Sequence, residues 1–347
     1  MGYLPYRYRP FGTFRLILAL FVVCQHFVAN AAPVGNLYAT FLPYELGSLA
    51  VLVFFCLSGF VITEAVDQVY ARKPAAYLIN RFLRIVPHFV VAVVISIVIH
   101  RLFFDWGTLR IADREHPALY SAQAFEWWNI GGNLLGFLPG ANHVIAYDFV
   151  DIVWAVRVEM VFYFAVFFAL LVRPMRCPIP VLLLALGIGC VFVARQFGLF
   201  FFFAYGVLLY DWRRHKRDLF ASILGMMLYF ALLPVRNHNR AVALQFVILA
   251  GLIATLTWLA FHQTQRRSFD RQCGDLSYPL YIYHQNMLIL VISATAGYSY
   301  FVFFSGIALS LLTSYGLMRL VDPVVNRLRD IIRGRRLERP NPVVRPS

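Results

Sequence analysis

The chain has 347 residues, of which 61% are hydrophobic and 14% are charged. A typical soluble domain has about 25% charged residues, so this composition excludes an ordinary soluble protein and indicates repeated passage through a membrane. The formal net charge is +14. The basic residues are spread over loops between apolar segments and over a polar tail, which indicates contact with membrane lipid headgroups and not with nucleic acid.

Ten apolar segments are candidates to cross a bilayer. They cover residues 14–31, 47–65, 86–104, 152–171, 179–194, 197–210, 219–234, 241–261, 276–296 and 299–320. The fifth and sixth are short, so they could also be tilted helices or one broken hairpin. The pattern predicts an all-α polytopic membrane protein with about ten transmembrane helices.

The distribution of basic residues predicts the orientation. With both termini and every even-numbered loop in the cytoplasm, 24 of the 31 Lys and Arg residues are inside, six are at or beyond the outer face, and Arg157 falls within a span. This asymmetry obeys the positive-inside rule, so both termini are expected to be cytoplasmic. Residues 1–326 form the expected membrane domain, and residues 327–347, with seven Arg and three Pro, form a basic cytoplasmic tail.

The first segment carries Arg15 and His26, eleven residues apart. On a helix this spacing returns to nearly the same face after a rise of roughly 16 Å. Ionisable groups in a membrane are costly and mark candidate functional sites, although snorkelling of Arg15 and an interhelical hydrogen bond of His26 would also explain them. The segment resembles a signal peptide with a cleavage site at Ala29-Asn30-Ala31. We predict that it is retained, because cleavage would discard this pair.

The second and third segments carry two further motifs. Ser58 precedes Gly59, a pair that allows close helix approach, and Ser58 can also bond across helices. Arg81 and Arg84 are three residues apart at the predicted cytoplasmic start of the third segment, so their guanidiniums can converge on phosphate oxygens. They are candidates to bind a donor such as coenzyme A; the alternative is positive-inside anchoring.

The fourth segment carries Trp154, Glu159 and Tyr163. Glu159 lies about 10 Å into the membrane by helix rise, so the carboxylate requires a partner, for which Arg157, His26 and Arg15 are candidates. A purely structural ion pair is the alternative.

Before the fourth segment, residues 105–151 form the longest extramembrane stretch. Within it, residues 129–139 are apolar but too short to span, so they predict an interfacial or re-entrant segment.

The ninth segment carries Ser277, Tyr281 and His284 at i, i+4 and i+7, a polar stripe that indicates a cavity-lining face. The five cysteines are scattered and show no metal-ligand spacing, so no metal is expected.

Five motifs in this order now form a recognisable set. They are Arg15-x3-Ala19-x6-His26, Phe54-Phe55-x-Leu57-Ser58-Gly59-Phe60, Arg81-x2-Arg84-Ile85-x-Pro87, Trp154-x4-Glu159-x3-Tyr163 and Ser277-Tyr278-x2-Tyr281-x2-His284. Together they resemble the integral-membrane acyltransferase family 3. Three features depart from the family pattern. Gly12-Thr13 stands near the position of an acidic residue that often precedes the first Arg, Asp322-Pro323 stands where Glu-Pro is frequent, and Cys56 and Ala155 replace the commoner Val and Ser.

The resemblance implies ten spans in a bacterial cytoplasmic (inner) membrane and transfer of an acyl group, as in O-acetylation, from cytoplasmic acyl-CoA. The acceptor would be a hydroxyl of a sugar, polysaccharide or lipid-linked glycan, although some relatives modify antibiotics or other small molecules. Acyl-CoA is then a substrate, and no permanently bound cofactor is expected. The acyl group, the acceptor and the oligomeric state are left open.

The expected mechanism is direct transfer. His26 acts as general base on the acceptor hydroxyl, while Glu159 and Arg15 complete the catalytic network. Arg81 and Arg84 bind the donor. The expected cavity-lining residues are Ser58, Trp154, Tyr163, Ser277, Tyr281 and His284. A covalent acyl-enzyme relay, a proton-coupled transporter or flippase, and a membrane scaffold are the alternatives. The absence of an evident pair of matching broken spans argues against the transporter.

Overall fold

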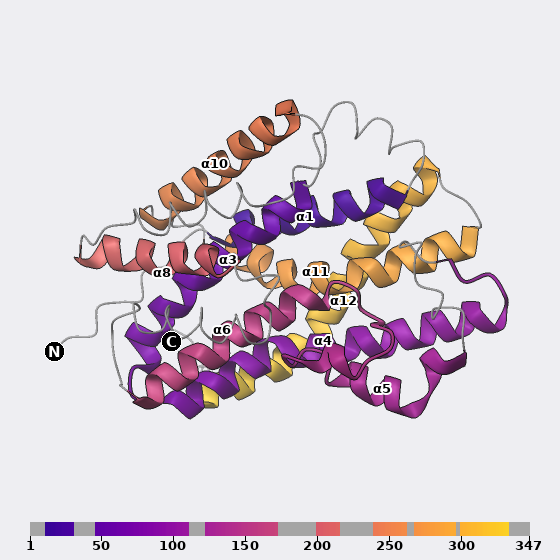
Figure 1. Ribbon diagram of the computed structural model, residues 1–347, viewed down its shortest axis with the longest axis horizontal. Helices are drawn as coiled ribbons and strands as arrows, with labels where there is room; N and C mark the ends of the chain where they lie inside the picture. Colours follow the sequence, from indigo (N-terminus) through magenta and orange to yellow (C-terminus); the bar gives the residue numbers. More distant parts are fainter. Residues whose placement is uncertain are drawn as a thin grey trace, which may run out of the picture.

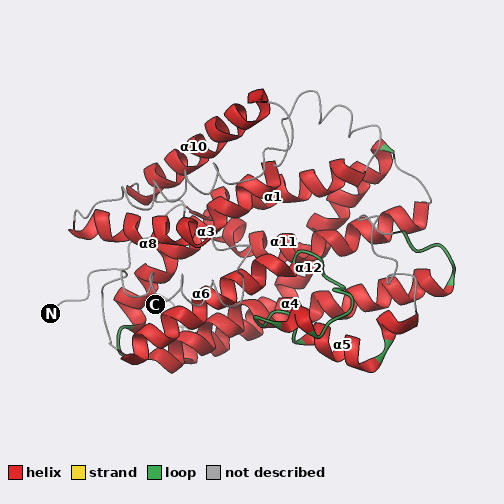
Figure 2. Cartoon of the chain, in the orientation of Figure 1, coloured by secondary structure: helices red, strands yellow, loops and turns green. Residues whose placement is uncertain are grey.

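The computed structural model describes residues 11–30, 46–110, 122–172, 199–215, 239–261, 267–295 and 299–332. These residues form helices and connecting turns, with no strand among them (Figure 2). Within this part of the chain, six helices are long and apolar enough to cross a membrane. The predicted spans 179–194 and 219–234 lie outside the described residues, as does most of the predicted tail.

Eight long helices carry the fold in the described part of the chain. They are α1 (Phe11–Asn30), α3 (Leu46–Ala65), α4 (Pro74–Asp105), α6 (Val153–Val172), α8 (Phe200–His215), α10 (Asn239–Phe261), α11 (Arg267–Thr295) and α12 (Tyr300–Ile332). The short elements are a π-helical turn at Val66–Tyr70, α5 (Trp127–Leu134) and 3-10 turns at Ala122–Phe125 and Ala141–His143. In Figure 1, α4 runs along the long axis of the molecule and α12 crosses it obliquely.

Three helices extend beyond the apolar segments that predicted them. The third segment was expected to begin at residue 86, but α4 begins at Pro74, a residue suited to the first helical turn. In the same way α11 begins before residue 276 and α12 continues past residue 320. Hydropathy reports the thickness of the apolar layer and not the ends of a helix, so it underestimates helices that continue into polar surroundings.

Helices α3 and α8 pack with their backbones in direct contact. A Cβ atom on Gly206 would collide with the carbonyl oxygen of Cys56, and one on Gly59 would collide with the carbonyl oxygen of Phe203. Small residues permit this approach between membrane helices. The close approach expected at Ser58-Gly59 is therefore confirmed, and α8 is the helix that makes it.

This packing predicts that Gly206→Ala is strongly destabilising. The added methyl group meets backbone that cannot rotate away, so a cost of about 3 kcal/mol or more is expected. Gly251→Ala is the control, because no atom lies within 4 Å of its added Cβ. Thermal unfolding in detergent, followed by size-exclusion chromatography, should show a lower midpoint for Gly206→Ala alone. Equal midpoints for the two variants would contradict the close packing.

The start of α1 is held by a carboxylate on α11. Asp270 accepts hydrogen bonds from the amides of Gly12 and Thr13 at 2.8 and 2.7 Å and from the Thr13 hydroxyl at 2.7 Å. These amides belong to a first helical turn, which has no intrahelical acceptors for them, and a negative charge is favourable there. The sequence itself has Gly12-Thr13, and no acidic residue, at the start of α1. Asp270 of α11 supplies a carboxylate next to this position.

Candidate functional site

A cavity lies between five helices, α1, α3, α4, α6 and α11. Its empty volume is about 650 Å³, counting the open space at its mouth. Its described lining residues are Arg15, Val51, Phe54, Phe55, Ser58, Arg84, Ile85, Ala155, Val156, Glu159, Ser277, Tyr278 and Tyr281. Two guanidiniums and one carboxylate therefore meet between walls that are largely apolar.

Glu159 is the acidic centre of this cavity. One of its oxygens, Oε1, accepts hydrogen bonds from the Ser58 hydroxyl at 2.9 Å and from the Tyr163 hydroxyl at 2.5 Å. Tyr163 is one helical turn further along α6, and Ser58 comes from α3. Arg15 is close enough to interact electrostatically with Glu159 and with Arg84. Of the three candidate partners of Glu159, Arg15 is therefore the one that shares the cavity wall with it.

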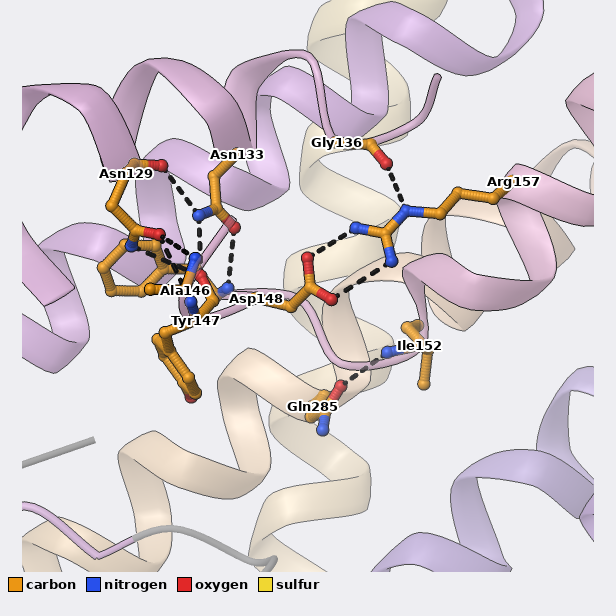
Figure 3. A network of polar contacts seen from close by, with 10 residues as sticks. Asn129, Asn133, Gly136, Ala146, Tyr147, Asp148, Ile152, Arg157 and Gln285 are labelled. Carbon is orange, nitrogen blue, oxygen red and sulfur yellow. Dashed lines mark hydrogen bonds and ion pairs between the residues drawn. The ribbon is translucent and has the colours of Figure 1, made fainter. Parts of the chain in front are cut away.

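Arg157, one of the three candidate partners of Glu159, pairs with a different carboxylate. Arg157 instead forms a two-pronged ion pair with Asp148, with Nη2 at 2.6 Å and Nη1 at 3.2 Å from the two carboxylate oxygens (Figure 3). Its Nε also donates to the carbonyl oxygen of Gly136 at 2.7 Å. Two residues apart on a helix are separated by about 200°, so Arg157 faces the segment before α6 while Glu159 faces the cavity.

Side-chain amides hold that segment in place. Asn133 of α5 donates to the Tyr147 carbonyl at 2.7 Å and accepts from the Phe149 amide at 2.8 Å, and Asn129 accepts from the Tyr147 amide at 3.2 Å. Gln285 of α11 accepts from the amide of Ile152 at 3.4 Å, immediately before α6 (Figure 3). Buried backbone groups outside regular secondary structure require such partners. The segment predicted as interfacial or re-entrant, 129–139, contains most of α5 and belongs to this network.

Arg81 and Arg84 have different surroundings, contrary to the expectation that both lie at a water-accessible helix start. Arg84 faces the cavity. Arg81 is only 5% exposed and lies between two aromatic rings, with its guanidinium carbon 5.5 Å from the ring centre of Tyr77 and 5.6 Å from that of Tyr163. The reason is the length of α4. It begins at Pro74, so Arg81 and Arg84 lie inside the helix and not at its start.

His26 and His284 form a ring pair beside the cavity. Their ring centres are 5.1 Å apart with an interplanar angle of 60°, and neither belongs to the described cavity lining. The Tyr281 ring lies on the cavity wall and is 6.2 Å from the His284 ring. Tyr281 therefore connects the cavity wall with the buried His284.

The predicted lining residues divide into two groups. Ser58, Ser277 and Tyr281 lie on the cavity wall. The other three do not: Trp154 is 37% exposed, Tyr163 is buried behind Glu159, and His284 is completely buried.

These motifs fall within a known family. A sequence profile described as an acyltransferase domain, that of acyltransferase family 3, matches residues 12–319. The chain belongs to acyltransferase family 3. Searches among curated proteins and among solved structures found no match. Family membership and the apolar helices make the protein a multi-pass membrane acyltransferase, and every residue of the cavity lies within the matched range.

The acyltransferase also contains a polar group that the sequence did not reveal. His88 on α4 is 3% exposed, its Nδ1 is 3.0 Å from the hydroxyl of Tyr283 on α11, and its Nε2 is 2.9 Å from Asp322 on α12. The ring of the cavity-lining Tyr278 is 6.0 Å from His88. The Asp322-Pro323 departure was visible in the sequence, but its partner lies 234 residues away.

Proposed function

We propose that this protein is a membrane O-acyltransferase that transfers an acyl group from cytoplasmic acyl-CoA to a hydroxyl of a sugar or lipid-linked glycan. The observation that carries the proposal is the cavity in which Arg15 and Arg84 face one carboxylate, Glu159. Two cations against one anion favour an anionic guest, and arginine forks suit phosphate oxygens. The apolar remainder of the wall suits the uncharged arm and acyl chain of the donor.

The spacing along α1 supports an extended donor. Arg15 and His26 are separated by roughly 16 Å of helix rise. Coenzyme A carries its phosphates and its thioester at opposite ends of a long flexible arm. With the phosphates at Arg15 and Arg84, the thioester would extend past Tyr281 towards His26. In this arrangement Arg15 binds a phosphate of the donor and does not stabilise the reacting thioester.

The proposed chemistry is direct acyl transfer. Neutral His26 takes the proton of the acceptor hydroxyl as its oxygen attacks the thioester carbonyl. The new C–O ester bond forms, the C–S bond breaks, and His26 returns the proton to the departing thiolate. The products are the acylated acceptor and free coenzyme A, with no net proton gained or lost. Glu159 balances the charge of Arg15 and holds the hydroxyls of Ser58 and Tyr163.

Transfer of label is the test. Purified protein in nanodiscs would be incubated with radiolabelled acetyl-CoA, longer acyl-CoAs in parallel, and a glycolipid extract from membranes of the source strain. Alkali-labile label in the glycolipid supports O-acyl transfer. Label that never leaves acyl-CoA, combined with uptake of a glycan into sealed vesicles, would favour the transporter.

The proposed orientation makes a separate prediction. In a bacterial inner membrane, both termini should be cytoplasmic and His143 should lie on the outer side. This orientation places 24 basic residues inside and six outside, in agreement with the positive-inside rule. Fusions of alkaline phosphatase and of green fluorescent protein after Ser347 should give fluorescence without phosphatase activity. The reverse result would invert the topology.

Because Arg81 and Arg84 have different surroundings, we expect different effects when each is replaced by lysine. Arg84→Lys should raise the KM for acyl-CoA about 10- to 100-fold, because a charged, two-pronged hydrogen bond is replaced by a single ammonium contact. Arg81→Lys should mainly lower the thermal midpoint, because it loses stacking between Tyr77 and Tyr163. Steady-state kinetics and thermal unfolding measure the two effects. An unchanged KM in Arg84→Lys would exclude bidentate phosphate binding there.

A further inference from the structure

His284 has one ring nitrogen engaged and one unpartnered. Its Nδ1 is 2.7 Å from the backbone carbonyl of Tyr281. A carbonyl only accepts, so Nδ1 must donate, and in the neutral ring Nε2 is then a bare acceptor. The side chain is completely buried, and Nε2 has no hydrogen-bond partner among the described residues.

An unpartnered buried acceptor requires an explanation. Such a group costs about 1–3 kcal/mol in desolvation, and an apolar ring of similar shape would pack without that cost. Buried unsatisfied groups in native proteins are few, and functional sites are one place where they occur. The position of Nε2 therefore points to a partner that is engaged only in another state of the site.

His26 is within reach of this acceptor. The two ring centres are 5.1 Å apart. A linear hydrogen bond of about 2.9–3.0 Å between nitrogens of two imidazoles places their centres roughly 5 Å apart. A rotation of the His26 ring, without movement of either helix, would be enough to align the two groups.

We propose that His284 is a positioning residue for the transfer reaction, and that its Nε2 accepts an N–H hydrogen bond from His26 when His26 carries the acceptor's proton. The proposal rests on the proposed function, in which His26 is the general base. A neutral imidazole that takes a proton becomes a ring with two N–H donors. One donor faces the reacting oxygen or sulfur, and the other faces His284. When the bare nitrogen of neutral His26 faces the acceptor hydroxyl, its other nitrogen already carries the proton that is donated to His284. This bond strengthens as His26 becomes charged, so it favours the transition state over the ground state.

Three substitutions separate the parts of this arrangement. His284→Gln places an amide oxygen near the position of Nε2 and keeps an acceptor for His26. His284→Asn places its amide near Nδ1, so it can keep the bond to Tyr281 but does not reach His26. His284→Phe keeps the ring shape without either group. Acyl transfer from radiolabelled acetyl-CoA to a glycolipid extract would be measured for each variant in nanodiscs.

The expected result is a selective loss of kcat. His284→Phe and His284→Asn should lower kcat about 10- to 100-fold, the usual effect of a hydrogen bond to a charged group, with KM for acetyl-CoA within about twofold. His284→Gln should recover most of the loss. In a His26→Gln background, His284→Phe should cause no further decrease. A purely structural role predicts instead that Gln, Asn and Phe lose folded protein together, and full activity in His284→Phe would overturn the proposal.

A measurement that does not depend on acyl transfer can test the histidine pair separately from the proposed acyltransferase function. In protein labelled with ¹⁵N-histidine, solid-state NMR at mildly acidic pH should show a coupling through the hydrogen bond between two imidazole nitrogens. The coupling should vanish in His284→Phe and in His26→Gln. Its presence in a protein that transfers no acyl group would retain the histidine pair and reject the acyltransferase chemistry. Its absence from the wild-type protein would reject the pair whatever the activity.

Discussion

His26→Gln should abolish acyl transfer while leaving the protein inserted and folded. Glutamine is of similar size and can still form a hydrogen bond, but it cannot take a proton from the acceptor hydroxyl and return it to the thiolate. Removal of general acid–base catalysis lowers rates roughly 10²–10⁴-fold. The rate of label transfer from acyl-CoA, normalised to the amount of monodisperse protein, is the measurement.

The control for this variant is His143→Gln, which changes an exposed histidine in the segment before α6. It should retain the wild-type rate. If His26→Gln kept near-normal turnover while His284→Gln were inactive, the general base would have to be reassigned to α11. If both retained activity, a histidine base would be excluded altogether.

Glu159→Gln should have the second largest effect. The amide can keep contacts with the hydroxyls of Ser58 and Tyr163, but it removes the carboxylate that faces Arg15 and Arg84. Glu159, Arg15 and Arg84 are half-buried, so removing the carboxylate should cost less than about 3–5 kcal/mol, the cost in a fully buried pair. We therefore expect a lower thermal midpoint and a loss of transfer of more than tenfold. Both are measured on the same nanodisc preparation.

Two further variants test the cause of this loss. Asp105→Asn breaks an ion pair with Arg101 whose side chains are 48% and 53% exposed. It should be nearly neutral, because exposed pairs contribute about 0–1 kcal/mol. Adding Arg15→Gln to Glu159→Gln should restore part of the thermal midpoint, because it removes an uncompensated cation. No restoration would mean that the uncompensated charge of Arg15 is not the cause of the lower midpoint.

The apolar segments predicted the helices because a bilayer imposes the same length and composition on every span. The Ser58-Gly59 contact was predictable for a related reason, since small residues allow close packing whichever helix approaches. Partners of charged groups were harder to predict. Asp148 lies on irregular backbone, whose course depends on Asn133 and Gln285 and not on a periodic pattern.

The burial of Arg81 and the contacts of His88 could not be predicted from the sequence either. Arg81 was assigned to a helix start because the apolar run begins at residue 86, whereas its burial follows from two tyrosines, one on α4 and one on α6. His88 joins α4, α11 and α12, an arrangement that depends on which helices become neighbours. Helix order in space is not encoded in hydropathy, so the composition of the cavity was predictable only in part.

The bonds from Gly12 and Thr13 to Asp270 have a consequence for biosynthesis. The partners are separated by 258 and 257 positions, so α1 leaves the ribosome long before the carboxylate that completes its first turn is made. During translation these amides have only water, lipid headgroups or a chaperone as partners. The first and last thirds of the chain then join at this point, so an amino-terminal fragment that lacks Asp270 also lacks these three hydrogen bonds. The amino end of α1 is therefore completed only after about three quarters of the chain has been made.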